Sequence, residues 1–316
     1  MLQFLVKRII GLIFVVFGLS FITFIMGHFA PGDPLTALLG TRAGDHALHA
    51  RLAHEYGLDL PWYTQYWNFL THALRGDFGL SFQNEGQKVT DVLAPTIGVS
   101  MQLGLMAFAL TLLVGIPVGI LAALKRNTWV DTASMGVMLF FYALPTFVLI
   151  PVYQLLMVFF VQKFNLSSPP LPIFGWTDGP QYKIIPVVIL ASAGMGYYAR
   201  LTRTVMLEIL GQDYVRTARS KGLRERVVIY VHALRNAMLP LLTVIGPSLA
   251  FIVNGAFVVE LLMVVPGVGQ YSVSAILQRD WPVVQATVII LATAVVVMNF
   301  VTDVCYSIVD PRIRLA

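Results

Sequence analysis

The chain has 316 residues, of which 57% are hydrophobic and only 12% are charged, and its formal net charge is +5. Soluble domains average roughly 45–50% apolar and about 25% charged residues, so this composition excludes an ordinary soluble protein and indicates a polytopic membrane protein. The single cysteine, Cys305, excludes an intrachain disulfide and a cysteine-ligated metal cluster.

The first predicted element is an apolar run over residues 9–29, which follows Lys7 and Arg8. This run is longer than the roughly 7–15 apolar residues of a signal peptide, so we predict a retained transmembrane helix. Further segments reach the roughly 20 mostly apolar residues that a spanning helix needs. They are residues 96–124, 131–161, 184–206, 238–264 and 283–309. The sequence therefore predicts an all-α fold, a polytopic membrane protein with six transmembrane helices and both termini on one side.

The distribution of basic residues orients these helices. If the N-terminus is cytoplasmic, fourteen of the 21 Lys and Arg residues lie on the cytoplasmic side. The positive-inside rule favours this orientation. Residues 30–95 are then an extracytoplasmic insert rich in Trp, Tyr and His, and residues 207–237 are the only long cytoplasmic loop.

This loop contains a dense basic block, "DYVRTARSKGLRERVVIYVHALRNAMLP", over residues 213–240. Asp213 and Lys221 suit the two ends of a short helix, because each charge opposes the helix dipole there, and Gly222 suits a left-handed cap. After the glycine, apolar residues recur at the spacing of a second short helix with one packed face. They are Leu223, Val227, Tyr230 or Val231, and Leu234.

The charge of this block alone has a simple explanation in membrane topology and attraction to anionic lipid. Nucleic-acid binding is disfavoured, because aromatic side chains that could stack on nucleobases do not alternate with the basic residues of the block.

A more specific feature is the spacing of Ala218 and Gly222, four residues apart within a helix-turn-helix. The block resembles the cytoplasmic "EAA" coupling loop of ABC-importer permeases, and most closely that of the dipeptide and oligopeptide permease subfamily. Arg216 and Thr217 stand where Glu and Ala give the loop its name, and Pro240 falls later than the proline of the general motif. Both departures are usual in the peptide subfamily. The fragments "APGDP", "GLDLPWYTQYW", "RGDFGLSF", "VVELLMVVPGVGQ" and "NFVTDVCYSIVDPRIR" resemble the same subfamily in the same order.

This resemblance implies a single ABC-importer transmembrane domain over residues 1–316, in a bacterial or archaeal plasma membrane with both termini cytoplasmic. It implies a permease for di- or oligopeptides with these partners: a second homologous permease subunit, two cytoplasmic ABC ATPase subunits, an extracytoplasmic substrate-binding protein and membrane lipid, but no nucleic acid. The residues expected to couple to an ATPase are Asp213, Tyr214, Arg216, Thr217, Ala218, Arg219, Ser220, Lys221 and Gly222. Importers of nickel chelates, glutathione or another small solute remain alternatives, as does an ion-driven secondary transporter.

The sequence offers no catalytic motif. It has no Gly-Lys dipeptide and so no phosphate-binding Walker A loop. We therefore expect a non-catalytic subunit with no cofactor of its own, whose partner ATPases bind ATP and Mg²⁺.

Polar residues within predicted spans are candidates for the translocation path or gate. They are Gln102, Asn254 and Glu260. Glu260 could equally anchor the neighbouring "PGVGQ" turn by accepting backbone hydrogen bonds. The insert holds His46, His49, His54 and His72. A metal-linked role for them is conceivable, but an exposed helix explains them as well, and we predict no metal site.

Overall fold

The structure is a computed structural model that describes residues 2–29, 35, 39, 45–84, 86–254 and 256–309. Within these residues the regular elements are helical, apart from an isolated bridge between Leu80 and Lys88. Six of the helices are long and apolar enough to cross a membrane. The predicted all-α, polytopic fold is thereby confirmed. The chain packs as two compact units. Unit 1 comprises residues 1–100 and 266–297, and unit 2 comprises residues 101–265 together with the end of the last helix.

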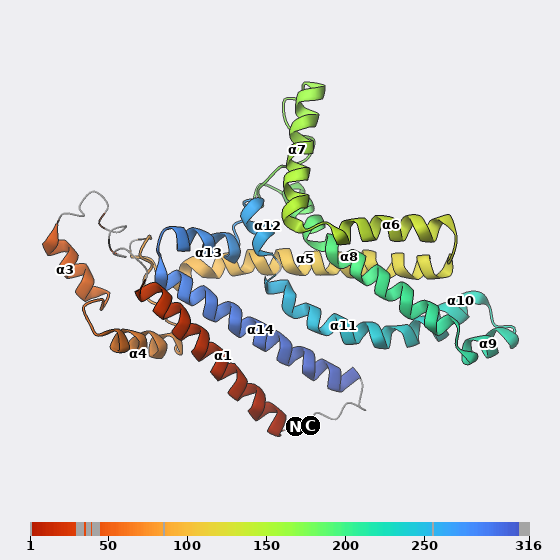
Figure 1. Cartoon of the computed structure of the whole chain (residues 1–316), viewed down its shortest axis with the longest axis horizontal. Helices are drawn as coiled ribbons and strands as arrows, with labels where there is room; N and C mark the ends of the chain where they lie inside the picture. Colours follow the sequence, from red (N-terminus) through yellow and green to blue (C-terminus); the bar gives the residue numbers. More distant parts are fainter. Residues whose placement is uncertain are drawn as a thin grey trace. The chain divides into compact units, whose positions relative to one another are not determined.

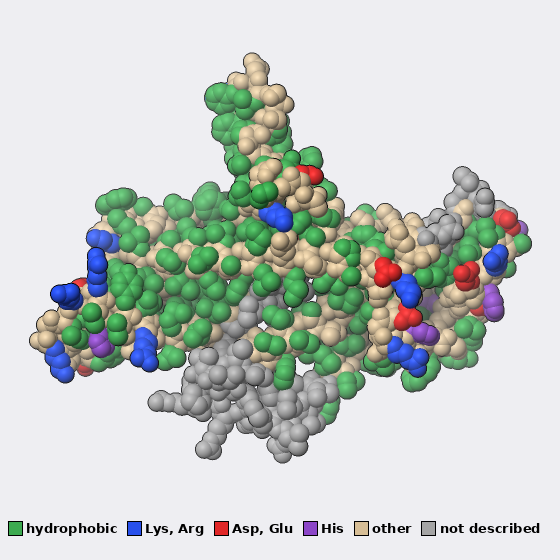
Figure 2. All heavy atoms as spheres, turned by 180° about the vertical axis from the view of Figure 1, so that it is seen from behind, with side chains coloured by type: hydrophobic (Ala, Val, Ile, Leu, Met, Phe, Trp, Pro, Cys, Tyr) green, Lys and Arg blue, Asp and Glu red, His purple; other side chains and the backbone are tan. Residues whose placement is uncertain are grey.

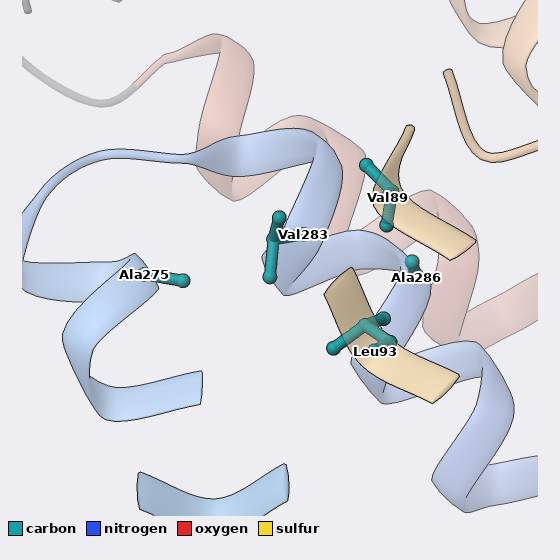
Figure 3. Packing of buried hydrophobic residues seen from close by; sticks show 5 residues of the cluster. All are labelled: Val89, Leu93, Ala275, Val283 and Ala286. Carbon is teal, nitrogen blue, oxygen red and sulfur yellow. The ribbon is translucent and has the colours of Figure 1, made fainter. Parts of the chain in front are cut away.

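Unit 1 is built around the N-terminal helix and the start of two long helices (Figure 1). Its elements are α1 (Leu2–His28), α3 (His46–Glu55), α4 (Trp62–Ala73), the first part of α5 (Val89–Leu124), α13 (Val268–Leu277) and the first part of α14 (Trp281–Val309). Figure 3 shows the buried apolar cluster that joins α5, α13 and α14. Its buried residues are Val89, Leu93, Ala275, Val283 and Ala286.

Polar contacts hold the described part of the predicted insert to the rest of unit 1. Tyr66 of α4 is buried against α1, where its hydroxyl lies 3.1 Å from the hydroxyl of Ser20. The buried carboxylate of Asp280, which precedes α14, accepts hydrogen bonds from the Ser81 hydroxyl and from the Phe82 backbone N–H, the latter at 3.0 Å. The insert is therefore a packed part of unit 1.

Unit 2 holds the end of α5 and a run of further helices. They are α6 (Trp129–Ala143), α7 (Thr146–Phe164), α8 (Pro180–Leu210), α9 (Asp213–Ser220), α10 (Glu225–Val227), the wide π-type turn η2 (Val228–Ala233), α11 (Leu234–Asn254) and α12 (Phe257–Leu262). Gly115 and Gly119 let α5 approach α8 closely. A Cβ added at Gly119 would lie 2.6 Å from the Thr202 Cβ, and one added at Gly115 would lie 3.0 Å from the Tyr198 Cβ. Such small-residue spacing is typical of tightly packed membrane helices.

Two of the predicted spans differ from the structure. The segment 131–161 is not one helix, because α6 ends at Ala143 and α7 begins at Thr146. A residue that precedes proline avoids the helical conformation, and Leu144, which precedes Pro145, is extended with ψ 119°. Figure 1 shows α6 and α7 running at a steep angle to each other.

The fifth predicted span, residues 238–264, begins too late. A continuous helical segment runs from Glu225 through η2 and α11 to Asn254, and α12 then begins at Phe257. The predicted second short helix of the loop is therefore the first part of the fifth span. The other four predicted spans are confirmed, with their ends shifted by a few residues.

Candidate functional site

The short helix α9 carries most of the residues predicted to couple to an ATPase. It follows the end of α8 after only Gly211 and Gln212 (Figure 1). Its inner face is apolar, because Val215 and Ala218 are buried together with Val228. Tyr214, Arg216 and Arg219 are exposed on its other side. α9 is thus an amphipathic helix that presents a polar, cationic face outward.

Gly222 ends this helix in the way that the sequence predicts. Its φ angle is 74°, in the left-handed region, and its backbone N–H donates to the Arg219 carbonyl at 2.9 Å. A Cβ added at this glycine would meet nothing within 4 Å. Glycine is therefore favoured here by the backbone conformation and not by a lack of space.

Two side-chain contacts orient α9 against the following helix. The guanidinium of Arg219 donates to the Glu225 carboxylate at 2.8 Å and 3.3 Å across the Gly222 turn. This hydrogen bond, more than the charge of Glu225, raises the pKa of Arg219. The Asn236 side-chain amide donates to the Tyr214 hydroxyl at 2.9 Å. Exposed ion pairs contribute only about 0–1 kcal/mol to the free energy of unfolding. The main effect of the Arg219–Glu225 pair is therefore to orient α9 relative to α10.

The remaining predicted coupling residues lie on the same short segment. The Thr217 hydroxyl donates to the Asp213 carbonyl at 2.9 Å, and the Ser220 hydroxyl donates to the Arg216 carbonyl at 3.1 Å. Lys221 is exposed at the C-cap. The structure therefore places all nine predicted residues on one helix and the turn that ends it.

Within this chain, the following helix does not pack through the predicted apolar stripe. Leu223, Val227, Tyr230 and Val231 are exposed, and Leu234 is the member of that stripe that packs. The fully buried residues are instead Val228, Ala233, Ala237 and Leu241. Their spacing is five residues and then four, and the first interval is the wide turn η2. Such turns rotate the face of a helix and are frequent at functional sites.

An ion pair that the sequence analysis missed fixes the C-terminal half of α8. The Arg203 guanidinium binds both carboxylate oxygens of Asp131, at 2.7 Å and 2.8 Å. Asp131 is buried, and its carboxylate also accepts from the Asn127 backbone N–H at 3.0 Å. This contact holds α8 to the start of α6. The one sequence signal for this ion pair is that Asp131 lies close to the basic residues Lys125 and Arg126.

The structure describes the side-chain surroundings of two of the three predicted path residues, Gln102 and Glu260. Gln102 is exposed, and its side-chain oxygen accepts from the Lys183 ammonium at 3.2 Å. Glu260 is only 1% exposed, and its backbone carbonyl accepts from the Val265 N–H at 2.9 Å. The side chain of Asn254 lies outside the described residues.

Three of the four insert histidines line a cavity of about 710 Å³ in unit 1. His49, His54 and His72 line it, and His46 does not. His54 lies 2.8 Å from the Asp59 carboxylate, and this hydrogen bond raises the pKa of His54 and lowers that of Asp59. Among the described residues no three His, Cys, Asp or Glu side chains are placed to hold a metal ion.

Two family models and several curated proteins match this chain. The family model described as "Binding-protein-dependent transport system inner membrane component" matches residues 115–315, and the model of that component's N-terminal part matches residues 1–118. The dipeptide transport system permease protein of Escherichia coli (strain K12) is 37% identical over 99% of both chains. The oligopeptide transport system permease protein of Salmonella typhimurium is 38% identical over 99% of this chain and 100% of that one. The glutathione transport system permease protein of Escherichia coli (strain K12) is 34% identical over 99% of both chains.

The fold is also found in a solved structure. A chain of the MetNI methionine ABC transporter in an inward-facing conformation aligns with a TM-score of 0.54 and 17% identity, over 69% of this chain and 96% of that one. The six apolar helices and the matched family make this chain a multi-pass protein of the bacterial inner membrane that works with ATPase and substrate-binding partners. The chain belongs to the family of binding-protein-dependent transport system inner membrane components.

Proposed function

We propose that this chain is one of two homologous membrane subunits of an ATP-driven importer of di- or oligopeptides. A second permease subunit completes the translocation path, two cytoplasmic ATPases drive it, and an extracytoplasmic binding protein delivers the peptide. The observation that carries the proposal is the geometry of α9, a rigid cationic helix fixed at the end of a spanning helix. Full-length similarity to dipeptide and oligopeptide permeases supports the choice of substrate.

The contacts of α9 explain how ATP-driven movement would reach the membrane. α9 is connected to α8 by two residues, and its buried side packs on Ile209 and Leu210 of α8. α8 is itself fixed to its neighbours close to α9, because the Asp131–Arg203 pair joins it to α6 and it lies against the glycines of α5. A partner that grips and moves α9 would therefore move these helices together, as a packed element with discrete positions.

The same proposal assigns the sides of the membrane. Both termini, α9 and the Lys125–Asp131 turn are cytoplasmic, and α3 and α4 are extracytoplasmic. The asymmetry of basic residues supports this orientation. ATP and Mg²⁺ bind to the partner ATPases, because this chain has no phosphate-binding loop.

Glutathione is the substrate alternative with a specific observation in its favour, the 34% identity to a glutathione permease. A nickel chelate or another small solute is compatible with the same architecture. An ion-driven carrier is less well supported, because such carriers typically place ionisable groups at mid-membrane, whereas Asp131 and Arg203 neutralise each other.

Reconstitution of the whole complex in proteoliposomes tests the proposal. We expect ATP-dependent uptake of a labelled dipeptide or oligopeptide that requires the binding protein and both ATPases. Uptake of glutathione but not of other peptides would move the assignment to the alternative. Uptake that needs an ion gradient and no ATPase would contradict the proposal.

A further inference from the structure

The basic block of the loop carries two surfaces that face different surroundings. The first is the outward side of α9, described above. The second, which we call the interfacial face, covers α10, η2 and the first turns of α11. Its members are Arg224, Arg226, Val227, Tyr230, Val231, Arg235 and Leu239, all of them exposed.

The apolar part of the interfacial face belongs to a membrane-spanning segment. Tyr230 is 58% exposed and Val231 is 52% exposed, and Leu239 continues the same exposed side into α11. These residues lie in the candidate span Glu225–Ile245. The opposite side of this segment is occupied by its buried residues, from Val228 to Leu241. The exposed apolar side is therefore continuous with the surface of a helix that enters the bilayer.

The basic part of the interfacial face has no carboxylate partner. Among the described residues, neither Arg224 nor Arg226 nor Arg235 forms an ion pair. Three other arginines of this unit do, because Arg203 pairs with Asp131, Arg216 with Asp213 and Arg219 with Glu225. Figure 2 shows Lys and Arg side chains next to hydrophobic ones at the end of unit 2 that carries α9 and α10.

This combination of groups matches the boundary between headgroups and acyl chains. Tyrosine is enriched at that boundary, and an arginine stem can lie along apolar surface while its guanidinium stays at the headgroup level. A guanidinium also donates to phosphate in a bidentate manner. We propose that the interfacial face binds anionic phospholipid of the cytoplasmic leaflet, separately from the partner bound by α9. The proposal rests on the proposed function only in placing this end of unit 2 on the cytoplasmic side.

A membrane is favoured over an ATPase as the occupant for two reasons. The apolar residues run on into the span, where a cytoplasmic protein could not follow. The Gly222 turn also separates this face from the exposed side of α9. Anionic lipid is favoured over neutral lipid because three guanidinium charges are left uncompensated.

Lipid quenching in the assembled importer tests this proposal. In a Cys305→Ser background, Val231→Cys carries a fluorophore, and the complex is placed in nanodiscs. The discs contain acyl-chain quencher lipids with either phosphatidylglycerol or phosphatidylcholine headgroups at equal mole fraction. Each basic residue near an anionic surface is worth about 1 kcal/mol, or roughly fivefold. We therefore expect the local preference for the anionic quencher to be about fivefold or more. Replacing Arg224, Arg226 and Arg235 together by Gln should remove it.

A matched variant keeps the interpretation specific. Replacing Arg216 of α9 and Lys221 at its C-cap by Gln lowers the charge of the same end of the molecule and should leave the lipid preference unchanged. Equal quenching by the two headgroups would overturn the proposal. So would a fluorophore that no lipid quenches but that the ATPases shield. The readout needs no transport, so a failure of peptide uptake would not affect it.

Discussion

Asp131 and Arg203 illustrate how a membrane protein keeps a charge inside its structure. The carboxylate is buried, but both of its oxygens bind the guanidinium and one also accepts a backbone N–H. A buried charge is expensive only when it lacks such partners. The pair also joins α6 to α8. These two helices pack closely, because a Cβ added at Gly196 of α8 would clash with the Met138 carbonyl of α6.

Asp131→Asn should therefore destabilise unit 2. Asn can accept only part of the guanidinium's hydrogen bonds, so we expect the free energy of unfolding to fall by about 1–3 kcal/mol. Thermal unfolding in detergent measures this loss. Arg200→Gln is the control, because Arg200 lies on the same helix but is exposed, and it should change the midpoint little. If Asp131→Asn and Arg203→Gln lower stability additively, the two side chains do not act as a pair.

At the scale of elements, the features that the sequence predicted correctly depend on residues close together in the chain. α9 and its left-handed glycine depend on residues within one turn of each other, so charge placement and Gly222 were enough to predict them. The apolar stripe predicted for the next helix is not the side that packs within this chain, because the pattern assumed a regular helical period and the wide turn η2 shifts that period. Pro145 explains the break before α7. The sequence analysis predicted one continuous span there, because the residues on both sides of this proline are apolar.

The Asp131–Arg203 pair could not be predicted in the same way. Its members are 72 residues apart, and no periodicity relates them. Single-sequence patterns of charge and hydropathy constrain neighbours along one helix, whereas this contact depends on which helices pack together.

Arg219→Glu tests the outward face of α9. The change removes the pair with Glu225 and places two carboxylates side by side. If an anionic surface of the ATPase binds this face, the Kd for the ATPase should rise about tenfold or more at low salt, and the effect should shrink as salt screens the charges. Binding of the purified ATPase to the permease pair in nanodiscs gives the values.

Arg235→Glu is the matched control for this measurement. It makes the same change of charge on the interfacial face, away from α9. An equal loss of ATPase affinity in the two variants would mean that net charge and not α9 determines binding.

At the scale of the whole molecule, the proposed coupling through α9 requires that this helix faces the cytoplasm. A cysteine at Gly44, in a Cys305→Ser background, probes the insert at a position that lies outside the described residues. In intact cells a membrane-impermeant thiol reagent should label Gly44→Cys and should label Ser220→Cys on α9 only after lysis. The reverse pattern would invert the topology and remove α9 from the side where ATPases bind.

The most direct test of the central claim, that α9 transmits ATP hydrolysis to the membrane helices, is the ratio of peptide uptake to ATP hydrolysis in proteoliposomes of the whole complex. A β-branched residue at a positive φ is strained, so Gly222→Val should redirect α9. Strain of about 1–3 kcal/mol at this turn is enough to lower the ratio roughly tenfold, while Gly222→Asn, which tolerates the left-handed conformation, should keep most of it. We expect both variants to assemble in the membrane. Normal uptake and normal hydrolysis by Gly222→Val at normal expression would contradict the assignment, and the charged block would then be explained by topology alone.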